Sequence, residues 1–270
     1  MKVVILCGGL GSRLAEETQI KPKPMVEIGG KPILWHIMKS YSQFGFEDFM
    51  LPLGYKAEII KEYFLNYHAL SGDLRVTLST GGAHYINRAT ENWEVQMHNT
   101  GDDTLTGGRL KRLEPYLRSH GTFMLTYGDG VCDVDIKALL AFHKSHGKIA
   151  TMTSVRPSAR FGTMSFNNDQ VTAFSEKSQT DSGWINGGFF VFEPEVFDYL
   201  NAGDQTILER APLEALAQAG QLHAFKHDGF WQCMDTIRDK QYLESLCSQG
   251  EMPWLKAASQ KSNEKLVEHV

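Results

Sequence analysis

A glycine-rich segment near the start of the chain carries residues that could bind phosphate. The apolar run 3–6 leads into Gly8-Gly9-Leu10-Gly11-Ser12-Arg13-Leu14, and Lys21-Pro22-Lys23-Pro24 follows. Glycine has no Cβ and tolerates positive φ, so a strand that ends in glycines lets backbone N–H groups approach an anion. Arg13 could donate a forked pair of hydrogen bonds to phosphate oxygens, and Lys23, between two prolines, offers a point charge. The segment therefore predicts a phosphate site.

Two common phosphate-binding loops do not fit this segment. The dinucleotide fingerprint G-x-G-x-x-G needs a third glycine where the chain has Leu14. A P-loop needs Gly-Lys followed by Ser or Thr, whereas the two Gly-Lys pairs here continue with Pro32 and Ile149. A redox Rossmann enzyme is therefore disfavoured. A simple glycine turn with solvated charges remains the plain alternative.

Asp129 could bind a hard metal ion. Asp129 lies in a Gly-Asp-Gly turn directly after the apolar run 123–127, where its carboxylate would be exposed. Mg²⁺ prefers one or two carboxylates together with phosphate oxygens and water. Asp235 heads the helix that we expect over 236–249, so by itself it is equally well explained as an N-cap. An ordinary turn is the corresponding alternative for Asp129.

Composition limits the class of protein. The chain has 270 residues and a formal net charge of −5, which argues against a nucleic-acid partner because such proteins normally present a basic face. Its four cysteines, Cys7, Cys132, Cys233 and Cys247, show no zinc spacing and are typical of reduced thiols in the cytoplasm. No apolar stretch approaches the roughly 20 residues of a membrane span. The first strand begins right after Met1, so we expect neither a leader nor a membrane partner.

Hydrophobic periodicity alternates between short β runs and amphipathic helices. Strands at 3–6 and 49–53 alternate with helices at 33–44 and 57–67, a β-α-β rhythm that predicts a parallel sheet. Further strands are expected at 74–78, 93–97, 123–127, 149–155, 163–166, 171–174, 184–192 and 222–225, and further helices at 108–118, 134–145 and 236–249. Ligands bind beyond the carboxyl ends of such strands. The glycine segment, the turn at 127–130 and the Glu176-Lys177 pair can therefore converge on one crevice.

The opening segment resembles the signature of the sugar-1-phosphate nucleotidyltransferases, G-G-x-G-[ST]-R-L followed by K-P-K-P. Glu176-Lys177 resembles the E-K-P element of that family, with Ser178 in place of the proline. Arg160-Phe161-Gly162 resembles R-[FY]-G, and Asn186-Gly187-Gly188-Phe189 resembles the sugar-binding strand, whose glycines would leave space for a pyranose ring. The resemblance covers residues 1 to about 255. It implies an α/β fold, a Rossmann-like open mixed sheet flanked by helices, of the nucleotide-diphospho-sugar transferase type.

The resemblance also implies a role for each matching residue. Arg13 and Lys23 would act as catalytic cations that neutralise the triphosphate, and Asp129 and Asp235 would bind Mg²⁺. The sugar phosphate would be bound by Gly162, Glu176, Lys177, Asn186 and Gly187. The nucleotide would be contacted by Leu6, Gly8, Gly9, Gly11, Ser12, Arg13, Lys23, Gly81, Thr104, Arg109 and Gly128. Arg109 is expected to open a helix, where its charge opposes the helix dipole, which favours a ligand as its partner.

Four segments, 26–39, 100–112, 126–131 and 229–231, are similar to the branch of the family that transfers a cytidylyl group to glucose 1-phosphate. The implied substrates are CTP and glucose 1-phosphate, and the implied products are CDP-glucose and pyrophosphate, for the biosynthesis of deoxysugars in cell-surface polysaccharide. The same chemistry with UTP or dTTP and a non-catalytic regulatory subunit that binds nucleotide or sugar phosphate remain alternatives. No general base is needed, so histidines and cysteines are given no catalytic role.

We expect a single domain over 1–252 and a polar tail over 253–270 that frays or makes a subunit contact. The family commonly self-associates, which implies a homo-oligomer, and Trp231 and Trp254 could support subunit contacts.

Overall fold

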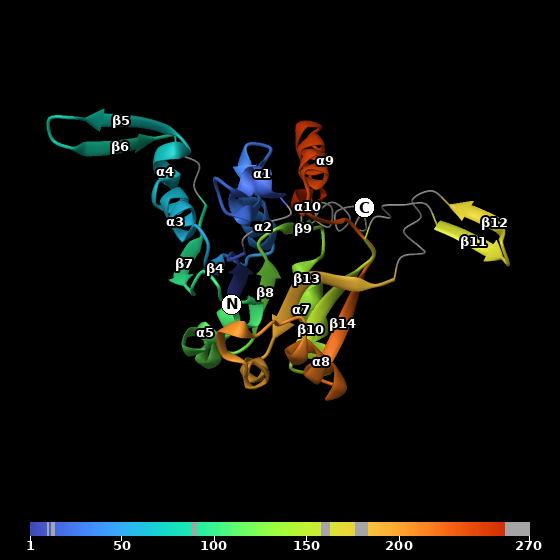
Figure 1. Ribbon diagram of the computed structural model, residues 1–270. Coiled ribbons are helices and arrows are strands. Elements are labelled where there is room, and N and C mark those ends of the chain that lie inside the picture. Colours follow the sequence, from blue (N-terminus) through green and yellow to red (C-terminus); the bar gives the residue numbers. More distant parts are fainter. Residues whose placement is uncertain (10, 12–13, 88–90, 158–162, 176–182, 257–270) are drawn as a thin grey trace, which may run out of the picture.

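A seven-stranded sheet forms the centre of the molecule (Figure 1). The computed structural model describes residues 1–9, 11, 14–87, 91–157, 163–175 and 183–256. In spatial order the strands are β14 (Leu222–His227), β10 (Ala150–Val155), β13 (Ile185–Phe192), β8 (Phe123–Tyr127), β1 (Lys2–Leu6), β4 (Asp48–Leu53) and β7 (Glu94–Asn99). The predicted α/β class is confirmed.

The sheet is mixed. β1 runs parallel to β4 and β8, β4 to β7, and β10 to β14, whereas β13 runs antiparallel to both of its neighbours, β8 and β10. The parallel strands predicted from the β-α-β rhythm are found at β1 and β4, and the mixed sheet that the family resemblance implied is confirmed by the antiparallel β13. A parallel neighbour needs a long crossover, usually a helix. The described part of the connection from β10 to β13 instead contains a hairpin, β11 (Thr163–Asn167) and β12 (Gln170–Ser175).

Hydrophobic side chains are buried on both faces of the sheet. In β1, Val3 and Ile5 belong to one buried cluster and Val4 to the other, because successive side chains of a strand point to opposite faces. The first cluster is covered by α2 (Ile33–Ser42), α7 (Ile136–His146) and α9 (Ile237–Ser248). The second is covered by α5 (Thr106–Arg112), α6 (Glu114–Leu117) and α8 (Ala211–Gln218). The sheet is thus fixed from both sides.

Several short elements complete this framework. The remaining helices are α1 (Ala15–Thr18), η2 (Lys23–Met25), α3 (Ala57–Leu65), α4 (Tyr67–Leu70), η3 (Arg118–His120), η5 (Pro194–Tyr199), η6 (Gly203–Gln205) and α10 (Pro253–Lys256). The remaining strands are β2 (Glu27–Ile28), β3 (Lys31–Pro32), β5 (Asp73–Thr77), β6 (Gly82–Ile86), β9 (Gly130–Cys132) and β15 (Trp231–Cys233). The hairpins β5–β6 and β11–β12 project from opposite sides of the molecule (Figure 1). No described helix is long and apolar enough to span a bilayer.

The last described helix, α10, belongs to the core. The side chain of Trp254 is 1 % exposed, and its Nε1 donates a hydrogen bond of 3.2 Å to Nδ1 of His36 in α2. Its ring also packs against that of Phe230. The prediction of a polar tail from residue 253 is therefore wrong for 253–256, where Trp254 fills the interior of its own chain rather than a subunit contact. Residues 257–270 lie outside the described part.

Candidate functional site

A cleft of about 510 Å³ opens at the edge of the sheet where β1 and β8 end. Parallel strands place their carboxyl ends at one edge, and the antiparallel β13 begins there, so loops from distant parts of the chain meet. The cleft is lined by Leu6, Gly8, Gly9, Gly11, Lys23, Pro24, Thr104, Leu105, Thr106, Arg109, Tyr127, Gly128, Asp129, Asn186, Trp231, Cys233 and Asp235. Its volume is in the range of small-molecule sites.

The side chain of Lys23 lies between two carboxylates in this cleft. Its Nζ is 2.6 Å from Oδ2 of Asp129 and 2.5 Å from Oδ1 of Asp235. The three side chains are only 11 %, 29 % and 15 % exposed, respectively. Burial disfavours the ammonium form, but the charges and hydrogen bonds of the two aspartates outweigh it and raise the pKa of Lys23. The cluster, taken by itself, carries a net charge of −1.

Local structure fixes each member of this cluster. Lys23 begins the 3₁₀ turn η2, in which Pro22 has φ −67° and accepts a hydrogen bond from the backbone N–H of Met25. Asp129 follows β8, and its carbonyl accepts a hydrogen bond of 2.8 Å from the N–H of Met234. The antiparallel ribbon β9–β15 therefore brings Asp129, just before β9, beside the segment that leads to Asp235.

Asp235 is not the N-cap of α9. Thr236 takes that position, and its hydroxyl accepts a hydrogen bond from the N–H of Asp239. The carboxylate of Asp239 accepts hydrogen bonds from the N–H groups of Asp235 and Thr236, which completes a capping box. The N-cap interpretation of Asp235 is therefore excluded, and its carboxylate reaches Lys23.

The glycine segment rests on a buried arginine. A Cβ at Gly8 or at Gly54 would overlap the guanidinium of Arg109, so a larger residue at either position would have to displace that side chain. Gly9, in contrast, has open space where a Cβ would be, and Gly11 has φ +63°. The backbone at Gly9 is therefore open to a ligand, and the phosphate contact of this loop stays a prediction.

The guanidinium of Arg109 is bound by the protein. Arg109 is 2 % exposed and lies inside α5 rather than at its start. Its nitrogens donate to the carbonyls of Leu53, Gly101 and Asp102 and to the hydroxyl of Thr100. Backbone carbonyls therefore meet this charge, and Arg109 fixes the loop 100–102 while also lining the cleft, so its contact with the nucleotide stays a prediction.

Gly81 and Gly187 are not among the residues that line the cleft. Gly81 lies in the turn between β5 and β6, a hairpin that projects from one side of the molecule (Figure 1), so its contact with the nucleotide stays a prediction. Gly187 is buried, and a Cβ there would lie 2.8 Å from Cγ1 of Val155. A Cβ at Gly188, which has φ +80°, would overlap the ring of Tyr127. The space that these two glycines leave is filled by the protein itself rather than by a pyranose ring.

A hydrogen-bonded chain forms the wall of the cleft around Tyr127. The Tyr127 hydroxyl donates to Oε1 of Glu209 at 2.6 Å and accepts from Nδ2 of Asn186 at 3.1 Å. The other Glu209 oxygen accepts from the hydroxyl of Thr106 at 2.7 Å. The indole of Trp231 donates to the carbonyl of Gly187 at 2.8 Å. Asn186 is therefore held by fixed partners.

Six lining residues were not predicted: Pro24, Leu105, Thr106, Tyr127, Trp231 and Cys233. Tyr127 and Trp231 could have been found, because both lie in segments already singled out by their aspartates. Burial and the nearby carboxylates raise the pKa of Cys233 to about 12, so this thiol is protonated at neutral pH and is not an activated nucleophile. Ser12, Arg13, Gly162, Glu176 and Lys177 lie outside the described residues.

Comparison with known proteins gives consistent matches. The sequence matches the Nucleotidyl transferase family over residues 2–240. It is 53% identical over 254 residues to glucose-1-phosphate cytidylyltransferase of Salmonella typhimurium, covering 94% of this chain and 98% of the relative. It is 44% identical over 254 residues to a probable glucose-1-phosphate cytidylyltransferase of Bacillus subtilis, covering 94% and 99%. Among solved structures, HddC from Yersinia pseudotuberculosis matches with a TM-score of 0.66 and 25% identity, covering 92% of this chain and 99% of that one.

Proposed function

This chain belongs to the nucleotidyl transferase family, and from that premise we propose that it transfers a cytidylyl group from CTP to glucose 1-phosphate in a magnesium-dependent reaction. The products would be CDP-glucose and pyrophosphate. The names of the two bacterial relatives support the choice of nucleotide and sugar. The observation that carries the chemistry is the Lys23 ammonium held between Asp129 and Asp235 in the cleft.

The donor set of this cluster fits a magnesium ion. Two carboxylates that both lie within 2.6 Å of one ammonium nitrogen are already arranged around a single cation. Carboxylate oxygens are the ligands that Mg²⁺ prefers. With its net charge of −1 the cluster would repel a triphosphate, whereas a divalent cation held by Asp129 and Asp235 would change that charge to +1. The ammonium of Lys23 thus occupies a place that suits Mg²⁺.

The proposed reaction is an in-line displacement at phosphorus. An oxygen of glucose 1-phosphate attacks the α-phosphorus of CTP, and the bond from that phosphorus to the bridging oxygen of the β-phosphate breaks. The attacking oxygen is already ionised at neutral pH, so no side chain has to remove a proton. The main obstacle is repulsion between two polyanions, which positioned cations reduce.

We assign the following roles to the chain. Mg²⁺, when bound by Asp129 and Asp235, would supply positive charge to the phosphate oxygens. Lys23, released from the two carboxylates, would place its ammonium on the triphosphate. The open backbone at Gly9 would admit the phosphates, and Asn186, fixed by Tyr127, would contact the sugar.

Pyrophosphate release tests this proposal. Purified protein is incubated with Mg²⁺ and glucose 1-phosphate, in parallel with CTP, UTP, dTTP, GTP and ATP. Release of pyrophosphate with CTP alone is the expected result. Release with another nucleotide would support the proposed reaction but assign it a different base. No release with any nucleotide would favour a subunit that binds nucleotide or sugar phosphate without catalysing the reaction.

Substitution of a proposed magnesium ligand tests the site. We expect Asp129→Asn to lower turnover by about 100-fold or more, the size of effect seen when one preorganised electrostatic group is lost. Asp198→Asn is the matched control, because that carboxylate is 62% exposed and, within the described residues, its ion pair is with Arg118, far from the cleft lining. Equal turnover by the two variants would show that Asp129 is not a ligand of the catalytic metal.

A further inference from the structure

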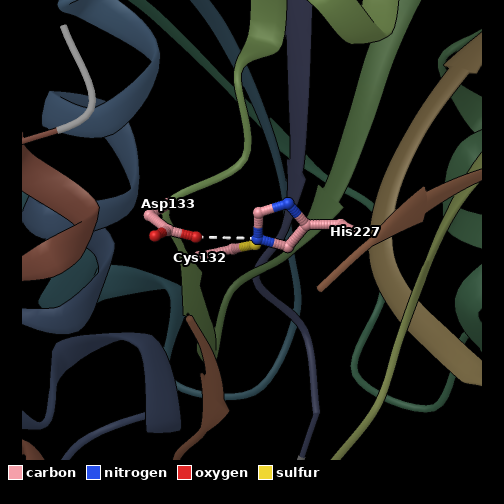
Figure 2. Close-up of side chains that lie close together, drawn as sticks. All are labelled: Cys132, Asp133 and His227. Atoms are coloured by element: carbon pink, nitrogen blue, oxygen red, sulfur yellow. Dashed lines mark hydrogen bonds and ion pairs between the residues drawn. The ribbon is translucent and has the colours of Figure 1, made fainter. Parts of the chain in front are cut away.

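Three potential metal ligands of different chemistry lie together outside the catalytic cluster. Figure 2 shows the thiol of Cys132, the carboxylate of Asp133 and the imidazole of His227 converging. Their ligand atoms all lie within 4.8 Å of one another, and Nε2 of His227 is 2.7 Å from Oδ1 of Asp133. Cys132 is 2% exposed, and the side chains of Asp133 and His227 are 30% and 15% exposed. The Cys132 thiol is therefore buried, whereas the Asp133 and His227 side chains are partly exposed to solvent.

We propose that Cys132, Asp133 and His227 form a second metal site, which binds a zinc-class divalent ion. Thiolate, imidazole and carboxylate are the three side-chain ligands that zinc uses, whereas Mg²⁺ prefers oxygen alone. Three protein ligands leave a fourth tetrahedral position for water. The site is thus chemically distinct from the pair of carboxylates in the cleft.

Only small movements separate the observed positions from a bound ion. With bonds of about 2.0–2.3 Å, neighbouring ligand atoms of a tetrahedral site lie about 3.3–3.8 Å apart. The Cys132 thiol would move inward, and the contact between His227 and Asp133 would open from 2.7 Å. Rotations of the three side chains would produce these movements and leave the strands in place.

Gly229 keeps the space beside these ligands open. A Cβ at this position would lie 2.5 Å from Oδ1 of Asp133 and 2.8 Å from Nε2 of His227. Any other residue at 229 would therefore press on both ligand atoms. The N–H of Asp133 donates to the carbonyl of Phe230 at 3.1 Å, which holds the backbone of the two segments together.

The hydrogen bond between His227 and Asp133 does not by itself explain why the thiol of Cys132 lies beside them. Burial raises the pKa of Cys132, so this thiol is protonated while no ion is bound. Metal binding would form the sulfur–metal bond and release the thiol proton to solvent. The imidazole would bind through Nε2 and carry its proton on Nδ1, and Asp133 would exchange its hydrogen bond for the metal.

The position of the site suggests a structural role. His227 ends β14 of the central sheet, and Cys132 ends β9 of the ribbon β9–β15. A metal there would fix the central sheet to the ribbon. Asp129 precedes β9 and Asp235 follows β15, so the same ribbon positions the two carboxylates of the cleft.

Cobalt substitution tests this proposal, because Co²⁺ adopts zinc geometry and a thiolate ligand produces a charge-transfer absorption band. Reduced, metal-free protein is titrated with Co²⁺ in the presence of excess Mg²⁺, which occupies the oxygen site. We expect one thiolate-bound Co²⁺ per chain, displaced by Zn²⁺. The band should be absent from Cys132→Ser and Cys132→Ala, and His227→Gln should weaken Co²⁺ binding by more than about 10-fold, as even loss of an outer ligand partner does.

Cys233→Ala is the matched control, because Cys233 is also on the ribbon but lies beside Asp235. The band should persist in this variant. Absence of the band from wild-type protein would overturn the proposal, as would a band that survives both Cys132 substitutions or that disappears with Cys233. Circular dichroism of each variant shows whether it is folded. The titration of the wild-type protein tests the proposal even if a variant fails to fold.

Discussion

Replacing Lys23 by methionine should tighten metal binding and slow catalysis at the same time. The ammonium makes two charge-assisted hydrogen bonds, of 2.6 and 2.5 Å, with the two carboxylates that we assign to Mg²⁺. Each such bond contributes about 1.5–3 kcal/mol, so a metal that displaces Lys23 breaks contacts that contribute about 3–6 kcal/mol in total. Solvation of the freed ammonium returns part of this. We expect a net gain of about 1.4–2.8 kcal/mol, which is 10- to 100-fold tighter binding of Mg²⁺ or Mn²⁺.

Calorimetric titration with Mn²⁺ in the absence of nucleotide measures this affinity, and pyrophosphate release measures turnover. Lys21→Met is the matched control: it removes a nearby lysine whose contact with Glu27, at 3.4 Å, lies outside the cluster. Its metal affinity and turnover should stay close to those of the wild type. Unchanged or weaker metal binding by Lys23→Met would refute the reasoning, because Lys23 and the metal would then not compete for the two carboxylates.

Two further predictions concern stability. Gly188→Ala should lower the free energy of unfolding by about 2 kcal/mol or more, because φ is +80° and the added methyl group would overlap Tyr127. Gly220→Ala is the control: at φ +64° and with open space, it should lower that free energy by only about 1 kcal/mol. Urea unfolding measures both. Stability should also fall as pH decreases below 6.5, since burial lowers the pKa of His36 and the unfolded chain binds the proton first. Protonation of Nδ1 of His36 would break the hydrogen bond from Trp254. His36→Asn should therefore reduce the change in the free energy of unfolding between pH 7 and 5, even if it lowers stability at every pH. The same pH dependence in the variant would show that another group causes it.

Local patterns predicted much of the central sheet. The strand over 123–127 has the predicted bounds because an apolar run is enclosed by polar and glycine residues. Helix α10 was missed because four residues are too few to show a helical period, and only the packing of Trp254 reveals that they are ordered. The direction of β13 is likewise a property of its connection rather than of its own residues.

In the candidate site, too, some features could be predicted from the sequence and others could not. Lys23 and Asp129 could be singled out because their neighbours are distinctive, and the family resemblance added Asp235. Their common contact could not be derived from spacing, because it depends on how β9 pairs with β15. The protein partners of Arg109 could not be predicted, because three of them are backbone carbonyls, which have no signature in the sequence.

The ion pair between Lys23 and Asp235 has a consequence for the synthesis of the protein. The two residues are 212 positions apart, so this contact becomes possible only when nearly the whole chain has left the ribosome. A nascent chain that ends before residue 230 contains the glycine segment and Asp129 but lacks β15 and the Thr236 cap. The glycine segment is therefore made early and stays without the second carboxylate until translation is almost complete.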